Sequence, residues 1–175
     1  ISFFNAFIFT LKGAGNDALT FHMRAVEWAV LGEWEFVLSH QLYSQLLGAL
    51  YQLTGPSLFL AQQFSICAYV ISAIFFRRLI TLFAIDKYSF GMLLIFSILP
   101  GSMLSHSITL REPFQIMFLI MSCYYGIESA YKFKFRSLFL FLGSCVGVAI
   151  LHKAFMVYVL ILLCVFILFK PNKIK

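Results

Sequence analysis

The chain has 175 residues, of which 62% are hydrophobic and only 11% are charged, against about 25% charged residues in an ordinary soluble domain. Such a chain has too little polar surface to face water on all sides, so the composition excludes an ordinary soluble protein and predicts an integral membrane protein. The formal net charge of +6 does not indicate nucleic-acid binding, because the basic residues cluster in short loops, as at the cytoplasmic ends of membrane helices.

The first segment, 1–11, is apolar but supplies only about half of the roughly 20 residues that a spanning helix needs. Because the chain also does not begin with Met, we expect it to be a piece of a longer protein that starts inside a partial first membrane helix. Residues 12–56 then interrupt the apolar pattern. We predict that they form an outer loop.

Two amphipathic helices are predicted in this loop. Over 18–31 apolar residues recur at helical spacing, while Asp17, Thr20, Arg24 and Glu27 form a polar stripe. A second helix is expected from an N-cap near Ser39 to Thr54, where Gly55 suits a C-terminal cap. The tryptophans and tyrosines of both segments are typical of helices that lie along the membrane interface.

Five membrane helices are expected next, at about 57–76, 88–105, 113–131, 137–151 and 154–169. The last two are short, but one continuous helix through His152 and Lys153 would be about 50 Å long, which exceeds a bilayer. The sequence therefore predicts a single all-α domain, a polytopic transmembrane helix bundle with two interfacial helices in its first outer loop.

The positive-inside rule orients this bundle. It places most basic residues in the cytoplasm: Arg77, Arg78, Lys87, Lys132, Lys134, Arg136, Lys170, Lys173 and Lys175. The outer side then receives most of the acidic residues, four basic residues and all four histidines: Asp17, Glu27, Glu33, Glu35, Glu112, Lys12, Arg24, Arg111, Lys153, His22, His40, His106 and His152. The chemistry is therefore expected on the outer face.

Three groups on that face are candidates for chemistry, and each has a structural alternative. Asp17 is either a general base or only a helix N-cap. Arg111 and Glu112, which open a membrane helix before Pro113, either clamp a phosphate or serve only as an internal ion pair or an interfacial anchor. Lys153 either neutralises a lipid phosphate or extends to the headgroups.

No cofactor is expected. The four cysteines lie inside apolar runs without metal-ligand spacing, and the histidines do not form a helical zinc pair. The sequence therefore predicts no metal site among these residues, and it leaves the metal requirement of the reaction open.

The order of these motifs resembles the GT-C superfamily of integral-membrane glycosyltransferases, which includes protein O-mannosyltransferases and lipid A aminoarabinose transferases. The stretch from Gly15 to Ala25 is similar to the family's D-x3-[YF]-x3-A motif, here Asp17, Phe21 and Ala25. Two interfacial helices follow, as in that family. The stretch from Leu99-Pro100 to Arg111-Glu112 resembles its later outer-loop element, and Ala149 to Lys153 resembles a segment that ends in a basic residue.

The resemblance implies an inverting transfer from a polyprenyl-phosphate sugar to a glycan, lipid or protein acceptor, with Asp17 as the base. The lipid phosphate and the sugar would then contact Arg24, His106, Arg111, Glu112, His152 and Lys153. It places the chain in the inner membrane of a bacterium, among membrane lipids, with the active site facing outward. The chain departs from the family at Asn16-Asp17, where some members carry an acidic pair.

Two other functions fit the sequence. A membrane polysaccharide polymerase of the O-antigen or exopolysaccharide type also uses lipid-linked glycans and outer-face arginines, and its product would be a growing chain. A transporter or flippase component would instead line a path through the bilayer with Asp17, Arg111 and Lys153. An enzyme requires these three residues to meet in one outer pocket.

Overall fold

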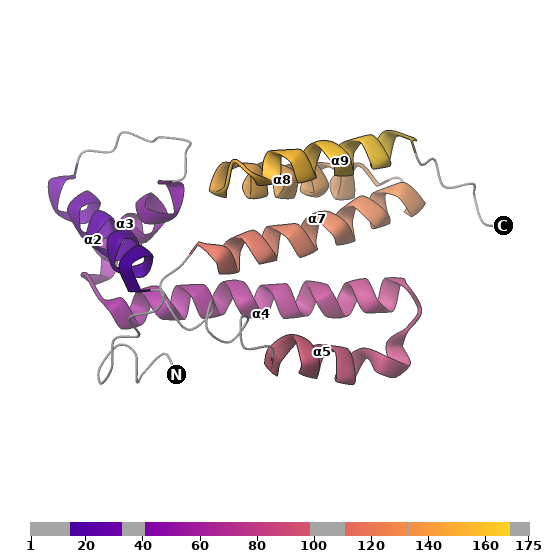
Figure 1. Ribbon diagram of the computed structural model, residues 1–175, viewed down its shortest axis with the longest axis horizontal. Coiled ribbons are helices and arrows are strands. Elements are labelled where there is room, and N and C mark those ends of the chain that lie inside the picture. The colour runs from indigo at the N-terminus through magenta and orange to yellow at the C-terminus, as the bar shows by residue number, and fades with distance from the viewer. Residues whose placement is uncertain (1–14, 33–40, 99–110, 133, 169–175) are drawn as a thin grey trace.

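The computed structural model describes residues 15–32, 41–98, 111–132 and 134–168. Within these ranges the chain is all-helical and contains no strand, which confirms the predicted all-α class (Figure 1). The partial first helix at 1–11 and His106 lie outside the described residues.

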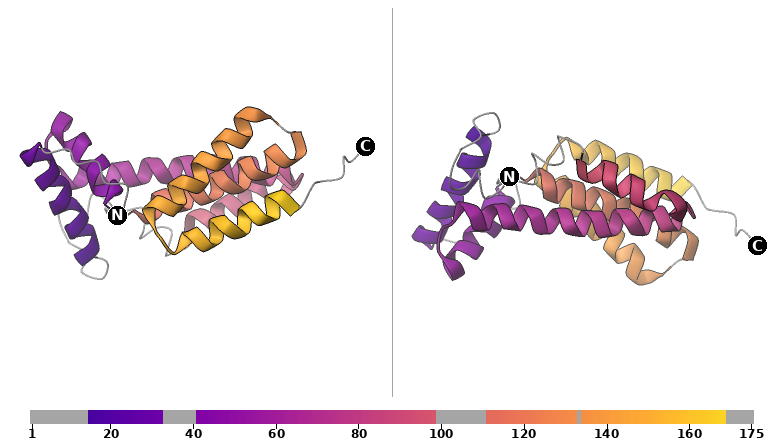
Figure 2. Two further views of the ribbon diagram at one scale, coloured as in Figure 1. Left: turned by 90° about the horizontal axis from the view of Figure 1, so that it is seen from above. Right: turned by 90° about the horizontal axis from the view of Figure 1, so that it is seen from below.

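Helices α2 (Gly15–Leu31) and α3 (Leu42–Thr54) pack together across one end of the other helices (Figures 1 and 2). Gly48 permits this close approach, because a Cβ atom added there would lie 2.8 Å from Trp28 Cβ. Helix α3 ends at Gly55, whose φ of 84° confirms the predicted glycine cap. Its N-cap is Gln41, two residues after the predicted Ser39.

The longer apolar side chains of α2 face outward. Leu19 and Met23 are 54% and 55% exposed, and Leu53 of α3 is 86% exposed. The buried surface between the two helices and the bundle uses small and aromatic residues instead: Ala18, Phe21, Ala25, Tyr43, Leu47 and Tyr51. Of the apolar stripe predicted over 18–31, Leu19, Met23 and Val30 are therefore not covered by the described part of this chain, whereas Val26 packs against the core.

Helix α4 (Leu58–Leu82) is the longest element, and at 25 residues it measures about 37 Å. Ser57 caps its start, since the Ser57 side chain accepts a hydrogen bond from the Leu60 N–H at 3.3 Å. The predicted end at residue 76 was wrong. Arginine is a good helix former, so the helix continues through Arg77 and Arg78 and ends only before Ala84, which has a φ of 56°.

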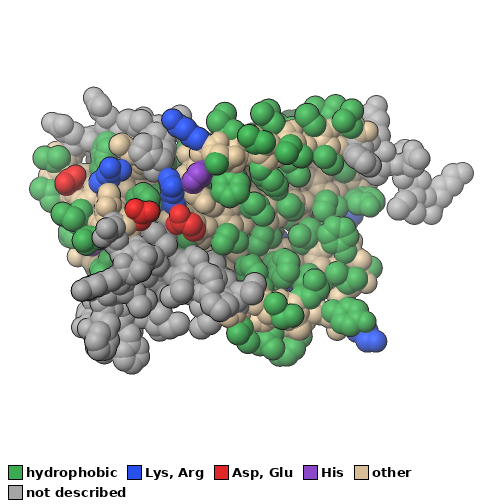
Figure 3. Space-filling model, viewed as in Figure 1, with side chains coloured by type: hydrophobic (Ala, Val, Ile, Leu, Met, Phe, Trp, Pro, Cys, Tyr) green, Lys and Arg blue, Asp and Glu red, His purple; other side chains and the backbone are tan. Residues whose placement is uncertain are grey.

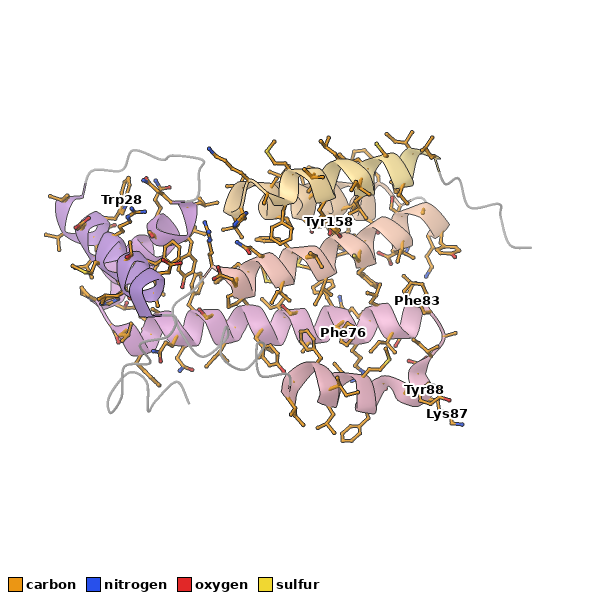
Figure 4. The ribbon with its side chains drawn as sticks, viewed as in Figure 1. Trp28, Phe76, Phe83, Lys87, Tyr88 and Tyr158 are labelled. Atoms are coloured by element: carbon orange, nitrogen blue, oxygen red, sulfur yellow. The ribbon has the colours of Figure 1, made fainter. Side chains whose placement is uncertain are left out.

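A short return segment lies beside α4. It consists of the 3-10 helix η1 (Asp86–Tyr88) and α5 (Ser89–Ile98), which runs back along α4 (Figure 1). Phe76 of α4 points toward α5 (Figure 4), and its ring centroid is 5.1 Å from that of Phe96. The described part of the predicted helix at 88–105 thus agrees with α5, and its remainder lies outside the described residues.

Helix α7 (Glu112–Lys132) packs against α4 on one side and α8 (Phe135–Leu151) on the other. Small residues bring α7 and α8 together: a Cβ atom on Gly147 would lie 2.9 Å from the Phe118 ring. Helix α9 (Phe155–Leu168) turns back after His152 and Lys153 (Figure 2), and Phe166 meets Phe141 of α8 at 5.1 Å. The predicted hairpin is confirmed, and the single continuous helix is excluded.

Within the described ranges, α4 alone is both long enough and apolar enough to cross a membrane. Helices α8 and α9 are apolar but shorter, at 17 and 14 residues. Neither α5 nor α9 buries any residue, and much of the face seen in Figure 3 over these helices is hydrophobic. The outer surfaces of these helices would be unfavourable in water.

Candidate functional site

Arg111 stands directly before α7, where its position is fixed by the start of that helix. Its carbonyl oxygen accepts hydrogen bonds from the N–H groups of Phe114 and Gln115, at 3.1 and 3.2 Å. Pro113 occupies the first turn, where its missing N–H leaves no helical bond unmade. The prediction that a helix opens at Arg111 and Glu112, with Pro113 in its first turn, is confirmed, with Glu112 as the first helical residue.

The Arg111 guanidinium contacts two other helices. Its Nη1 donates a hydrogen bond to the carbonyl oxygen of Leu151, the last residue of α8, at 3.3 Å. Its Cζ lies 5.7 Å from the centroid of the Phe21 ring on α2, which is cation–π distance. One side chain therefore joins the D-x3-[YF]-x3-A segment, the start of α7 and the end of α8.

The ion pair between Arg111 and Glu112 is incomplete. Their closest atoms, Nε and Oε1, are 3.8 Å apart, beyond hydrogen-bond distance. The buried atoms Nε of Arg111 and Oε2 of Glu112 have no hydrogen-bond partner among the described residues. The predicted internal ion pair is thus present, but it is not closed by a hydrogen bond.

Asp17 and Arg24 lie on the same face of α2 as Phe21, because positions i, i+4 and i+7 of a helix share one side. Asp17 is one turn before the ring that Arg111 covers, and Arg24 is about one turn after it. Asp17 is exposed, and Arg24 is partly buried. Asp17 is the third residue of α2, so the alternative in which it is only the N-cap is wrong. Its carboxylate still lies in the first turn, near the positive end of the helix dipole.

His152 and Lys153 form the turn between α8 and α9. The His152 Nδ1 atom accepts a hydrogen bond from the Ala154 N–H at 3.2 Å. A backbone N–H can only donate, so the neutral imidazole carries its hydrogen on Nε2 and can donate it to a ligand. Lys153 is exposed, and both residues follow directly after the Leu151 carbonyl that Arg111 binds.

A second polar contact holds α2 in place, and the sequence did not single it out. The His22 Nδ1 atom is 2.6 Å from the Tyr51 hydroxyl, which donates to the Ser57 carbonyl at 3.1 Å. Because a phenol has one hydrogen, Nδ1 is the donor in the first bond. Burial lowers the pKa of His22 and raises the pKa of Tyr51, so the neutral forms of both groups are favoured.

A series of aromatic contacts packs Phe21 against the other helices. Its ring meets Tyr43 edge-on at 5.4 Å, Tyr43 meets Phe114 at 5.6 Å, and Phe114 meets Phe64 at 4.8 Å. These rings come from α2, α3, α7 and α4, and burial raises the pKa of the Tyr43 hydroxyl. No local sequence signal marks such contacts, because each partner lies on a different helix.

Charged side chains gather on one part of the molecular face, where α2 meets the neighbouring ends of α7 and α8 (Figure 3). The structure thus brings the segments of Asp17, Arg24, Arg111, Glu112, His152 and Lys153 to this junction through the contacts of Arg111. The remaining predicted ligand, His106, lies outside the described residues. Within the described ranges, His, Cys, Asp and Glu residues form no group that could hold a metal ion.

Comparison with known proteins adds no relative: no protein-family model, curated protein or solved structure matches this chain.

Proposed function

We propose that the chain is part of a membrane glycosyltransferase of the GT-C type, which transfers a sugar from a polyprenyl-phosphate donor to an acceptor on the outer side of the membrane. The observation that carries the proposal is the position of Arg111, which contacts Phe21 and Leu151 from the N-terminus of α7. A guanidinium at a helix N-terminus is well suited to hold a lipid phosphate.

The proposal includes a polytopic arrangement in the bilayer. Helix α4 would cross it with α5 and α7 beside it, α8 would lie beside α7 and α9 beside α8, and their apolar outer faces would lie in lipid. Helices α2 and α3 would lie along the outer interface, across the ends of the membrane helices. The basic end of α4 and α7 would then face the cytoplasm.

In the proposed reaction, the Asp17 carboxylate accepts the proton of an acceptor hydroxyl. The acceptor oxygen forms a bond to the anomeric carbon as the bond from that carbon to the phosphate oxygen breaks, and the polyprenyl phosphate leaves with the electron pair. Arg111 and Lys153 would stabilise the charge that develops on this phosphate. The Nε2–H of His152 supplies a further donor on the same side.

The arrangement of Arg111 favours an enzyme over a transport component. A translocation path would distribute its charged groups along the bilayer. Here Arg111 binds the carbonyl of Leu151, the residue immediately before His152 and Lys153. Arg111 and Lys153 therefore lie at the same end of α7 and α8. A polymerase would share this arrangement, and product analysis separates the two: addition of one sugar supports the transferase, and chain growth supports the polymerase.

Donor turnover tests the proposal. Membranes that contain the full chain are incubated with radiolabelled polyprenyl-phosphate sugars, and release of polyprenyl phosphate is measured. We expect turnover by the native chain, its loss in Asp17→Asn by a factor of at least about 100, and its retention in the control Glu27→Gln, which removes a different α2 carboxylate. Near-native turnover in Asp17→Asn would overturn the assignment of the base.

A further inference from the structure

A second charged region lies at the opposite end of α7 from Arg111. Helix α7 has 21 residues from Glu112 to Lys132, so its two ends are roughly 30 Å apart. The pocket at the far end has a volume of about 620 Å³ and is lined by Arg77, Arg78, Thr81, Tyr124, Glu128 and Lys132, among others. We call it the basic pocket.

A smaller pocket of about 250 Å³ adjoins the basic pocket and shares Arg78, Tyr124 and Glu128 with it. It adds Lys134 and Arg136, which stand at the start of α8. Five basic side chains from three helices therefore face a connected space that has one carboxylate in its lining. Such a density of like charge is unfavourable unless a counter-charge is present.

The chain does not supply that counter-charge in its described part. Glu128 accepts a hydrogen bond from the Ser137 hydroxyl at 2.7 Å, and no described carboxylate lies within 4.0 Å of any of the five cations. Arg78 is directed toward the Phe75 ring, with its Cζ 5.1 Å from the centroid. Arg78 is exposed, so its hydrogen-bond donors remain available to a ligand.

We propose that the basic pocket binds the phosphate group of an anionic ligand. Arginine and lysine together provide the bidentate and point-charge contacts that phosphates require. The apolar surroundings favour a phospholipid headgroup as the source, since Ile74 and Leu82 line the pocket and Ile74 is 48% exposed, where acyl chains would lie. A soluble phosphate compound has the same chemistry, and the experiment below separates the two.

The test uses the purified full chain in a neutral detergent. Phosphatidylglycerol, phosphatidylcholine and inorganic pyrophosphate are titrated separately, and binding is measured by intrinsic fluorescence and thermal shift. The pocket variant is Arg78→Gln with Arg136→Gln. The control is Lys87→Gln, because Lys87 follows the end of α4 near this region but points away from the bundle beside Tyr88 (Figure 4).

Loss of about thirtyfold in phosphatidylglycerol affinity in the pocket variant, with the control within twofold of the native chain, supports a lipid site. The same loss for pyrophosphate alone supports a soluble phosphate ligand. Unchanged affinity for both phosphatidylglycerol and pyrophosphate in the pocket variant overturns the proposal, and so does equal binding of phosphatidylcholine and phosphatidylglycerol by a native chain that binds no pyrophosphate. Arg78→Lys with Arg136→Lys retains the charge and should recover most of the affinity, which separates a lost contact from a misfolded variant.

Discussion

The Arg111 guanidinium lies over the Phe21 ring, with Cζ 5.7 Å from the ring centroid. This contact joins the start of α7 to the face of α2 that also carries Asp17, and the hydrogen bond from Arg111 to the Leu151 carbonyl extends the junction to α8. Arg111 thus links the α2 segment that carries Asp17 to the end of α8 that precedes Lys153. The proposed transfer reaction depends on this junction.

The chemistry of arginine at this position is testable by a substitution that keeps its charge. Arg111→Lys retains the cation but loses the planar fork that binds Leu151 and stacks on Phe21. We expect the KM for the polyprenyl-phosphate donor to rise about tenfold with a smaller change in kcat, measured by donor turnover in membranes. Lys87→Gln, which lies outside both proposed sites, is the control and should leave the KM unchanged. An unchanged KM in Arg111→Lys would remove this residue from donor binding.

The ring beneath Arg111 gives a separate prediction. Phe21→Leu preserves an apolar side chain but removes the cation–π contact, which contributes about 0.5 to 2 kcal/mol depending on exposure. We expect a decrease in donor kcat/KM of about two- to thirtyfold. The double variant with Arg111→Gln should lose little more than Arg111→Gln alone, because the two residues act through one contact. Fully additive losses would show that Phe21 acts only through helix packing.

Packing between α2 and α3 depends on Gly48. Its added Cβ would lie 2.8 Å from Trp28 Cβ and 3.1 Å from the Ala25 carbonyl oxygen, so Gly48→Ala must push the helices apart. We expect a loss of about 1 to 3 kcal/mol in the free energy of unfolding, measured by denaturation in detergent. Gly143→Ala is the control, because nothing lies within 4 Å of its added Cβ and alanine favours the helix. Equal stability of the two variants would contradict the close approach of α2 and α3.

The stability of the chain should fall in mild acid because of His22. Burial lowers the His22 pKa in the folded state below the ordinary value of about 6.5. The unfolded chain therefore binds more protons once the pH drops below that value, and stability decreases as the pH falls from there toward the folded-state pKa. Above about pH 7 both states are neutral at this residue and its contribution is constant.

Thermal unfolding between about pH 8 and pH 5 checks this prediction. His22→Gln has no titrating ring but keeps a donor that can reach the Tyr51 hydroxyl, so its melting temperature should depend less on pH than that of the native chain. Tyr51→Phe removes the hydrogen-bond partner and should lower stability across the whole range. Identical pH dependence of the native chain and His22→Gln would show that another group controls acid sensitivity.

Much of the helix arrangement could be predicted because it follows local chemistry. The turn at His152 and Lys153 was found because two polar residues interrupt an apolar run, and Gly55 marked the end of α3. The end of α4 could not be predicted in this way, because Arg77 and Arg78 suggest a boundary in the sequence although arginine continues a helix without strain. The outward position of the α2 apolar stripe was also invisible, because periodicity does not say which side another helix covers.

The candidate site could be predicted only in its separate parts. The Arg-Glu-Pro helix start is local, and its geometry agrees with the structure. The contacts that unite the site are not local: Phe21 with Arg111, Arg111 with the Leu151 carbonyl, and His22 with Tyr51 each join residues from different helices. Such pairings arise from tertiary packing, and a backbone carbonyl such as that of Leu151 has no sequence signature at all.

The most direct measurement of the central claim is photo-crosslinking with a polyprenyl-phosphate probe whose reactive group is next to the phosphate. The native chain in membranes is irradiated, digested and analysed by mass spectrometry. We predict that the label is found on peptides from α2, the start of α7 and the turn after α8, and that Arg111→Gln abolishes it. Label confined to peptides that carry Arg77, Lys132 or Arg136, and unchanged by Arg111→Gln, would contradict the proposed donor site.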